Sequence, residues 1–258
     1  LPDASRTAKG LPIVNVINMQ PDETVTTLMK VRDYNLAKYL FFTTRQGRVK
    51  RVALDQFKSV RSTGMIAIGI DADDELAWVR MTEGEDEMVL VTSGGQAIRF
   101  PEGDVRPMGR TAAGVIGIRL DPGDRVIASD VVTPDKDLLV VSAKGLGKRT
   151  GLDQYRAQSR GGKGIQAMRL TDRTGAIVAA GMAGPDDAIM LMNNKGIAIR
   201  IAASQISRIG RTTQGVTLMR LGKTEEIVQM TVIEPKDPSA AARLNGLEDG
   251  EPEEESAS

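Results

Sequence analysis

The sequence has no cysteine and no histidine among its 258 residues. Without cysteine there can be no disulfide, no thiolate nucleophile and no cysteine-ligated metal. Without histidine the chain also lacks the commonest general base and the commonest ligand of transition metals. These absences argue against hydrolytic and metal-assisted chemistry, so we predict no catalytic residue, no metal site and no cofactor for this chain.

Long apolar runs and aromatic side chains are also scarce. No stretch approaches the roughly 18 consecutive apolar residues of a membrane span, and the N-terminal "LPDASRTAKG" lacks the pattern of a signal peptide. We therefore expect a soluble, cytoplasmic protein with no membrane partner. The chain has only three Tyr, four Phe and one Trp, which disfavours a single-strand binder, because such proteins stack bases on aromatic rings.

The formal net charge is zero, but the charges are unevenly distributed. Residues 237–258 hold seven acidic residues and one basic residue, which leaves 33 basic and 27 acidic residues in 1–236, a net charge of +6. A basic body with an acidic tail indicates a polyanionic partner. We expect the tail, 237–258, to be disordered, and it has two interpretations: a segment that aids solubility, or a competitor for the basic surface.

Two motifs recur along the chain. The first aligns without gaps over twelve residues, and its glycines are 48, 50 and 51 residues apart. Its copies are "LFFTTRQGRVKR" (40–51), "MVLVTSGGQAIR" (88–99), "LLVVSAKGLGKR" (138–149) and "IMLMNNKGIAIR" (189–200). The second motif is R-x-x-x-G followed by an apolar run, with one residue missing in its second copy. Its copies are "RTAKGLPIVNV" (6–16), "RSTGMIAIGI" (61–70), "RTAAGVIGIRL" (110–120), "RGGKGIQAMRL" (160–170) and "RTTQGVTLMRL" (211–221).

The motifs divide residues 1–236 into a half repeat and four full repeats of about 50 residues. The predicted boundaries are 1–35, 36–86, 87–136, 137–186 and 187–236. Because the chain begins in the middle of a repeat, we expect it to be a fragment of a longer protein.

Short apolar runs rich in Val and Ile, separated by Gly, Asp and Pro, predict β-strands. Examples are "KYLFFTT" (38–44), "RVKRVAL" (48–54), "MIAIGI" (65–70), "ELAWVRM" (75–81) and "EMVLVTS" (87–93). Four strands per repeat in a repeated array are typical of propeller blades. We therefore predict an all-β, bladed propeller-like array, and we expect the glycine of each first motif to supply a positive φ in a hairpin turn.

The recurring arginines have two interpretations. Repetition with an angular step places equivalent side chains around one rim, which would form a basic track for the phosphates of double-stranded DNA. Alternatively, each arginine pairs with an acid inside its own blade. The first motif ends in Arg51, Arg99, Arg149 and Arg200, and the second begins with Arg6, Arg61, Arg110, Arg160 and Arg211.

The segment "AQSRGGKGIQ" (157–166) threads two cations among three glycines. Glycines let backbone N–H groups approach an anion closely while Arg160 and Lys163 supply charge, so the loop is a candidate phosphate cradle. A tight blade-closing turn is the other interpretation. The spacing does not fit a Walker loop, which needs G-x-x-x-x-G-K-[S/T].

The stretches "SRTAKGLPIVNVIN", "KYLFFTTRQGRVKRVALDQF" and "YRAQSRGGKGI" resemble the C-terminal domain of the DNA gyrase A subunit, and the resemblance covers nearly all of 1–236. The family's signature heptad is Gln-Arg-Arg-Gly-Gly-Lys-Gly, the gyrase box. Gln158–Gly164 matches six of its seven positions, with Ser159 in place of an arginine. The family's box normally lies in the first blade, whereas this match lies in the third full repeat, and the alignment places the first blade and half of the second before Leu1.

The resemblance implies a six-bladed β-pinwheel that wraps duplex DNA around its rim and so supports ATP-dependent negative supercoiling. It implies that this domain is not catalytic, that the cleavage tyrosine lies in a region absent here, and that ATP and Mg are used by the rest of the enzyme. The implied partners are double-stranded DNA and, in an A2B2 assembly, the gyrase B subunit with the remainder of the A subunit. In some members an acidic tail modulates wrapping.

Two other functions stay open. One is the corresponding domain of topoisomerase IV, which wraps DNA weakly and usually lacks the box. The other is a propeller scaffold that binds proteins, which would expose apolar patches in place of an arginine rim. The predicted DNA-binding residues are Gln158, Arg160, Gly161, Gly162, Lys163, Gly164, Arg51, Arg99, Arg149, Arg200, Arg110 and Arg211.

Overall fold

The computed structural model describes residues 8–19, 23–29, 31, 34, 37–59 and 64–235. Its strands are β1 (Tyr39–Thr44), β2 (Arg48–Ala53), β3 (Leu76–Thr82), β4 (Glu87–Thr92), β5 (Gln96–Pro101), β6 (Val115–Ile116), β7 (Val126–Val131), β8 (Asp137–Ser142), β9 (Leu146–Thr150), β10 (Ile165–Gln166), β11 (Ile177–Ala183), β12 (Ala188–Asn193), β13 (Ala198–Ala202), β14 (Val216–Thr217) and β15 (Ile227–Ile233). Short 3-10 helices are η1 (Ile13–Asn15), η2 (Leu54–Phe57), η3 (Glu102–Asp104), η4 (Leu152–Gln154) and η5 (Ala203–Gln205). The helices of the described residues are single 3-10 turns, and none has the length and hydrophobicity of a membrane span.

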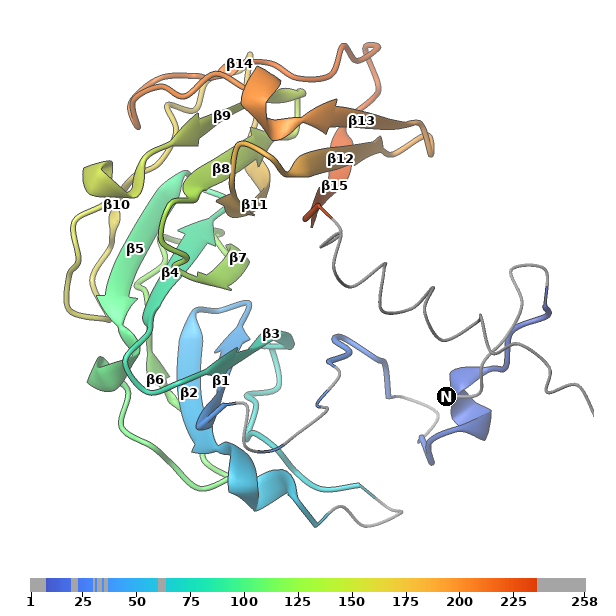
Figure 1. Ribbon diagram of the computed structural model, residues 1–258, viewed down its shortest axis with the longest axis vertical. Helices are drawn as coiled ribbons and strands as arrows, with labels where there is room; N and C mark the ends of the chain where they lie inside the picture. The colour runs from blue at the N-terminus through green and yellow to red at the C-terminus, as the bar shows by residue number, and fades with distance from the viewer. Residues whose placement is uncertain are drawn as a thin grey trace, which may run out of the picture.

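The strands form four antiparallel sheets, which are the blades of the array. Their strand orders are β3-β1-β2-β6, β10-β5-β4-β7, β11-β8-β9-β14 and β13-β12-β15. The blades follow one another along a crescent, with β3, β7, β11 and β15 on the concave side (Figure 1). The prediction of an all-β, bladed array is confirmed.

The fourth strand of a blade is exchanged between repeats. The segment that follows R-x-x-x-G does not join the hairpin of its own repeat: Ile165 of β10 pairs with Ala97 of β5, and Val216 of β14 pairs with Gly147 of β9. Each of these strands has only two residues. The second motif therefore joins each repeat to the preceding blade by adding a short strand to the outer edge of that blade.

One predicted strand is wrong. Residues 65–70 form no sheet ladder among the described residues. Their described hydrogen bonds run from the Gly69 N–H to the carbonyl of Ala112 at 3.1 Å and from the Lys50 Nζ to the carbonyl of Ala67 at 2.8 Å. An apolar run that packs in extended form against a loop has the same composition as a strand, so the pattern alone does not separate the two.

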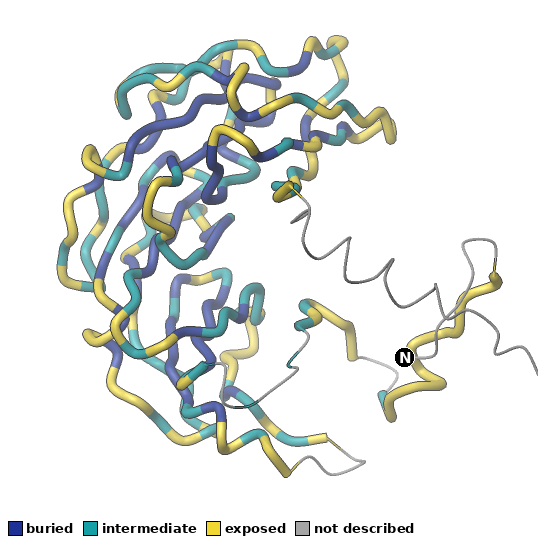
Figure 2. The backbone as a smooth tube through the Cα atoms, in the orientation of Figure 1, coloured by how far each residue is buried: buried dark blue, intermediate teal, exposed yellow. Residues whose placement is uncertain are grey.

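The core lies in layers between the blades. Along β4, Met88 and Leu90 face the preceding blade, whereas Val89 and Val91 face the following one. Side chains alternate across a strand, so a sheet buried on both faces needs continuous apolar runs. Figure 2 shows this as buried central strands with exposed turns and outer loops.

The hairpin turns formed by the first motif of each repeat depend on glycine. The glycines of the four first motifs all have a positive φ, between 77° and 87°, which confirms the predicted turns: Gly47, Gly95, Gly145 and Gly196.

Candidate nucleic-acid interface

Three of the four arginines that end the first motif are directed into the protein. Arg51 and Arg149 are 6% and 8% exposed. Arg51 lies 3.4 Å from the carboxylate of Glu102 and stacks over the ring of Tyr39, and Arg149 lies 3.3 Å from the carboxylate of Asp137. Arginine forms such buried pairs because its planar guanidinium reaches several acceptors at once.

Arg99 shows what this arginine does between blades. Its guanidinium binds the Glu87 carboxylate through two nitrogens, and its Nη1 also donates to the carbonyls of Leu152 and Tyr155 at 3.1 and 3.2 Å. Arg149 likewise donates to the carbonyl of Ile206. These carbonyls belong to the next repeat, around η4 and η5, so the arginine joins consecutive blades.

The expectation that this arginine lines an exposed rim is therefore wrong for Arg51, Arg99 and Arg149. The interpretation as an ion pair within the blade describes Arg99 and Arg149, whose acids, Glu87 and Asp137, each lie twelve residues earlier in the chain. Arg200 differs, because β13 forms the outer edge of its sheet among the described residues and the Arg200 side chain is exposed.

Three of the arginines that begin the second motif lie at the outer edge of the described blades. Arg110, Arg160 and Arg211 are each partly exposed, whereas Arg6 and Arg61 lie outside the described residues. Arg160 donates to the carbonyl of Ile116 at 3.1 Å, and Arg211 donates to the carbonyl of Gln166 at 2.9 Å. Each of these two arginines thus reaches the exchanged strand of the preceding loop, and the loops form a connected series along the outer edge.

The glycines of "QSRGGKG" have conformational roles. Gly161 and Gly164 both have φ of +77°, and a Cβ on Gly164 would lie 2.5 Å from the carbonyl oxygen of Ala97. Gly164 therefore allows the chain to meet the edge of β5 closely enough for β10 to pair. The Gly161 N–H donates to the carbonyl of Gly117 at 2.6 Å, so this amide is not free for an anion.

The two cations of this loop remain accessible. Lys163 has a side chain that is 69% exposed, and its ion pair with Asp121 is itself exposed to solvent; pairs of this kind contribute little free energy and exchange readily. Gln158 is different, because its side-chain nitrogen is buried without a hydrogen-bond partner in the described residues. The backbone N–H of Gln158 donates to the carbonyl of Arg99, and those of Met108 and Ile209 make the equivalent bond in the neighbouring repeats. Gln158 therefore occupies a position that is apolar and inward-facing in those repeats.

A further periodic set of arginines was missed by the sequence analysis. Arg119, Arg169 and Arg220 follow the exchanged strands, nine residues after the arginine of each second motif, and all three are exposed. Their side chains make no hydrogen bond or ion pair with any other described residue. The alignment of "VIGIRL", "IQAMRL" and "VTLMRL" already contained this signal.

These arginines lie against the loops of the following repeat. The backbone N–H of Arg119 donates to the carbonyl of Gly162 at 2.8 Å, and that of Arg169 donates to the carbonyl of Thr213 at 3.0 Å. Arg119 also shares one groove with Arg125 and Lys163, beside the turn of β1 and β2, and Asp121 and Asp124 line the same groove. The outer edge therefore carries unpaired cations at one position in each successive repeat, and we call this surface the arginine edge (Arg119, Arg169 and Arg220 with Arg110, Arg160, Lys163 and Arg211).

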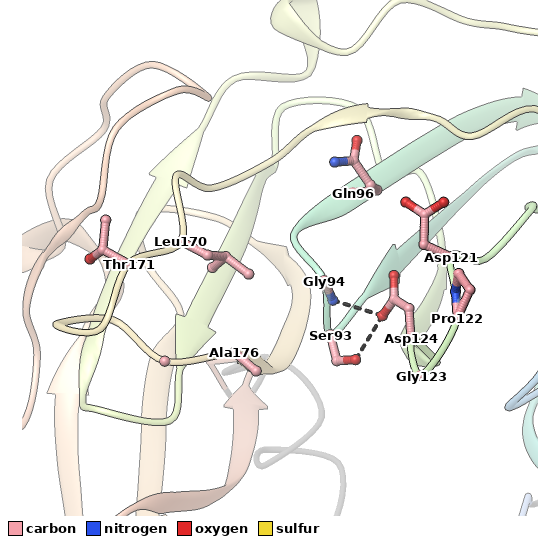
Figure 3. Close-up of a pocket in the computed structure, with 11 residues that line it drawn as sticks. Ser93, Gly94, Gln96, Asp121, Pro122, Gly123, Asp124, Leu170, Thr171 and Ala176 are labelled. Carbon is pink, nitrogen blue, oxygen red and sulfur yellow. Dashed lines mark hydrogen bonds between the residues drawn. The ribbon is translucent and has the colours of Figure 1, made fainter.

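A neighbouring hollow shares Asp121 and Asp124 with this groove but has none of its cations. It lies between the β4–β5 hairpin turn and the connections at 121–124 and 170–176, and it is lined by Asp121 and Asp124 but by no basic side chain of the described residues (Figure 3). Asp124 accepts hydrogen bonds from the Ser93 hydroxyl and the Gly94 N–H, both at 2.7 Å. Although burial raises the pKa of this carboxyl, these and neighbouring hydrogen bonds hold the pKa below its usual range. Asp124 is thus a fixed anion, and this hollow does not attract phosphate.

Comparison with known proteins places these features in a family. The family model of the DNA gyrase C-terminal domain, beta-propeller, matches residues 1–32, 38–83, 86–133, 136–182 and 187–234. The A subunit of DNA gyrase from Staphylococcus epidermidis is 41% identical over 240 residues, which cover 92% of this chain and 27% of the relative. The chain therefore spans about a quarter of the length of that protein.

Two solved structures share the architecture. A C-terminal domain of DNA topoisomerase IV superposes with a TM-score of 0.87 at 28% identity, covering 96% of this chain and 78% of the other. A DNA gyrase A C-terminal domain gives a TM-score of 0.78 at 26% identity, covering 88% and 76%. With the match of the family model across the five repeats, these results show that the chain belongs to the DNA gyrase C-terminal domain family.

Proposed function

We propose that this chain binds double-stranded DNA along the arginine edge and bends it around the convex side of the crescent. The observation that carries the proposal is the set Arg119, Arg169 and Arg220, which are exposed, unpaired among the described residues and repeated at the outer edge of successive blades. A polyanion of regular spacing is the ligand that a regular series of cations fits best.

The chemistry of this edge favours the backbone of a duplex over bases. Guanidinium and ammonium groups bind phosphate oxygens, and the chain has few aromatic residues on which unpaired bases could stack. A duplex that follows a curved row of phosphate contacts is bent with little dependence on sequence.

Within a whole enzyme we propose that this domain is the DNA-wrapping part of a gyrase A subunit, without a catalytic role of its own. The wrap would present a DNA segment to the cleavage region of the same polypeptide, and a gyrase B subunit would supply ATP hydrolysis in an A2B2 assembly, which supports negative supercoiling. The 41% identity to a gyrase A subunit over most of this chain supports this assignment.

A topoisomerase IV domain that binds DNA but wraps it weakly is the second candidate. The superposition with a topoisomerase IV C-terminal domain, at a TM-score of 0.87, favours it. The two candidates differ in whether bound DNA is wrapped, which is measurable.

The test of the binding surface is a salt titration of a duplex of about 150 base pairs. If Arg119, Arg169 and Arg220 each contact a phosphate, replacing all three by Gln lowers the slope of log K against log salt by about 0.9 per contact. The affinity lost between 50 and 200 mM salt then shrinks by about 40-fold for the triple variant. Lys38→Gln is the control, since Lys38 is an exposed cation outside the arginine edge; an equal change of slope per residue in this control would refute the assignment of the surface.

The test of wrapping uses a relaxed DNA circle with a relaxing topoisomerase. Captured writhe after removal of the protein supports the gyrase assignment. Binding without writhe supports the topoisomerase IV alternative, and no binding of the duplex overturns the proposal and leaves a protein-binding scaffold.

A further inference from the structure

Two lysines are buried where a charged side chain is costly. Lys50 on β2 and Lys148 on β9 are both fully buried, and both immediately precede the arginine that ends the first motif. Ile98 and Ile199 occupy this position in the other two repeats. A buried ammonium is tolerated only where acceptors surround it, so the partners of these lysines show what they do.

Both lysines bind the loop of a second motif from its inner side. The Lys148 Nζ donates to the carbonyls of Gly210, Arg211 and Thr213 at 2.7, 2.5 and 3.1 Å, and also meets the Thr213 hydroxyl at 3.1 Å. The Lys50 Nζ donates to the carbonyl of Ala67 at 2.8 Å and to the carbonyl of Arg110. In both blades one acceptor is the backbone of the arginine that begins the loop.

The geometry has an electrostatic consequence. The ammonium lies behind a loop whose own arginine is positive, so repulsion disfavours an inward position of the guanidinium. Burial first, and then the charge of Arg211, lowers the pKa of Lys148 to about 8. Lys148 therefore still carries its proton at neutral pH and can use all three donors.

The third loop provides an internal comparison. Under "QSRGGKG" the position is Ile98, whose Cδ1 lies 3.7 Å from where a Cβ on Gly162 would be. That loop is held instead by Arg160, which donates through its Nε to the carbonyl of Asp104 at 2.9 Å. Its own lysine, Lys163, lies outside. Two loops thus place a lysine beneath the backbone, and one places it on the surface.

We propose that Lys50 and Lys148 are positioning residues of the arginine edge, which hold the backbone of Arg110 and Arg211 so that these arginines face DNA. This inference rests on the proposed function, since it assumes that these arginines contact DNA. The lysines have no exposed surface and act only through the loops.

The experiment compares Lys148→Met, Arg211→Gln and the double variant in the full 258-residue chain, with a mixed-sequence duplex of about 150 base pairs as the probe. We expect Arg211→Gln to lower the salt slope by about 0.9. Lys148→Met should lower the slope by a similar amount, although Lys148 cannot reach DNA. The double variant should lower the slope no further than either single variant. Ile98→Met is the matched control, since it changes the same buried position in a blade without a lysine, and its slope stays that of the unsubstituted chain.

The outcomes distinguish a failure of the proposed DNA contact at Arg211 from a failure of the positioning role of Lys148. If Arg211→Gln leaves the slope unchanged, the proposed DNA contact at this loop is wrong. If Arg211→Gln lowers the slope and Lys148→Met does not, the positioning role is overturned and Lys148 serves the fold alone. Should Lys148→Met fail to fold, Lys50→Met with Arg110→Gln gives the same comparison at a loop that offers its lysine fewer acceptors.

Discussion

Arg99 and Arg200 occupy the same place in their repeats but have opposite surroundings, so one substitution at both positions separates structure from DNA binding. Arg99 binds Glu87 and two carbonyls of the next repeat, whereas Arg200 is exposed on an outer strand. Changing each to Met removes the same charge and leaves a side chain of similar length.

The expected cost at Arg99 follows from its partners. Loss of the guanidinium leaves the Glu87 carboxylate and the carbonyls of Leu152 and Tyr155 without their donors in a site where both side chains of the ion pair are mostly buried. Breaking a pair of this kind costs about 2–4 kcal/mol of unfolding free energy, below the range for complete burial. In a domain of this size the melting temperature then falls by about 5–10 °C. Arg200→Met changes the unfolding free energy by no more than about 0.5 kcal/mol.

Denaturant unfolding, followed by circular dichroism, measures the change in unfolding free energy. The salt dependence of duplex affinity measures the change in DNA binding. We expect Arg99→Met to be destabilised with an unchanged salt slope and Arg200→Met to be stable. If Arg99→Met were as stable as Arg200→Met and instead lowered the salt slope, the assignment of Arg99 to the joint between blades would be refuted.

Three further predictions concern the loops and the tail. Gly164→Ala should destabilise the fold by about 1–3 kcal/mol, because the new Cβ would meet the Ala97 carbonyl and the residue would keep a positive φ. Gly162→Ala is the control: its Cβ would have its nearest neighbour at 3.7 Å, so the unfolding free energy in the same denaturation assay should change by less than about 0.5 kcal/mol. Burial lowers the pKa of Lys148 to about 8 from its ordinary value of 10.5, so between these values Lys148 binds fewer protons in the folded state than in the unfolded state. From about pH 8 to 9.5 the unfolding free energy of the unsubstituted chain should therefore rise relative to that of Lys148→Met, with a slope of at most about 1.4 kcal/mol per pH unit. Parallel curves for the two proteins would show that the pKa of Lys148 is not lowered. Removing residues 237–258, which lie outside the described residues, should tighten duplex binding if the acidic tail competes for the arginine edge, and an unchanged affinity would leave the tail a solubility segment.

Local features were readable from the sequence because their causes are local. The strand predicted over 38–44 is β1 (Tyr39–Thr44), and the glycine of each first motif adopts the positive φ that its hairpin turn requires. A short apolar run bounded by turn residues favours a β-strand over most of its length, so the repeat pattern alone indicated a bladed array.

Contacts between repeats were harder to read. The arginines at 51, 99 and 149 recur as regularly as surface residues would, and only the neighbouring carbonyls and carboxylates decide that they are internal. Arg119, Arg169 and Arg220 recur with the same regularity, yet nothing in the sequence marks them as exposed. Periodicity identifies equivalent positions in the repeats. Whether such a position is buried depends on which groups of the next repeat pack against it.

The sequence by itself determined that this protein is an all-β array of repeats, because alternating side chains and turn glycines act within a few residues. Only the tertiary structure decided which blade each second motif completes, because a two-residue strand such as β10 is stable only against the edge that accepts it. The tertiary structure also decided which of two equally periodic sets of arginines is available to a partner, because a guanidinium held by buried acceptors is no longer free to bind phosphate.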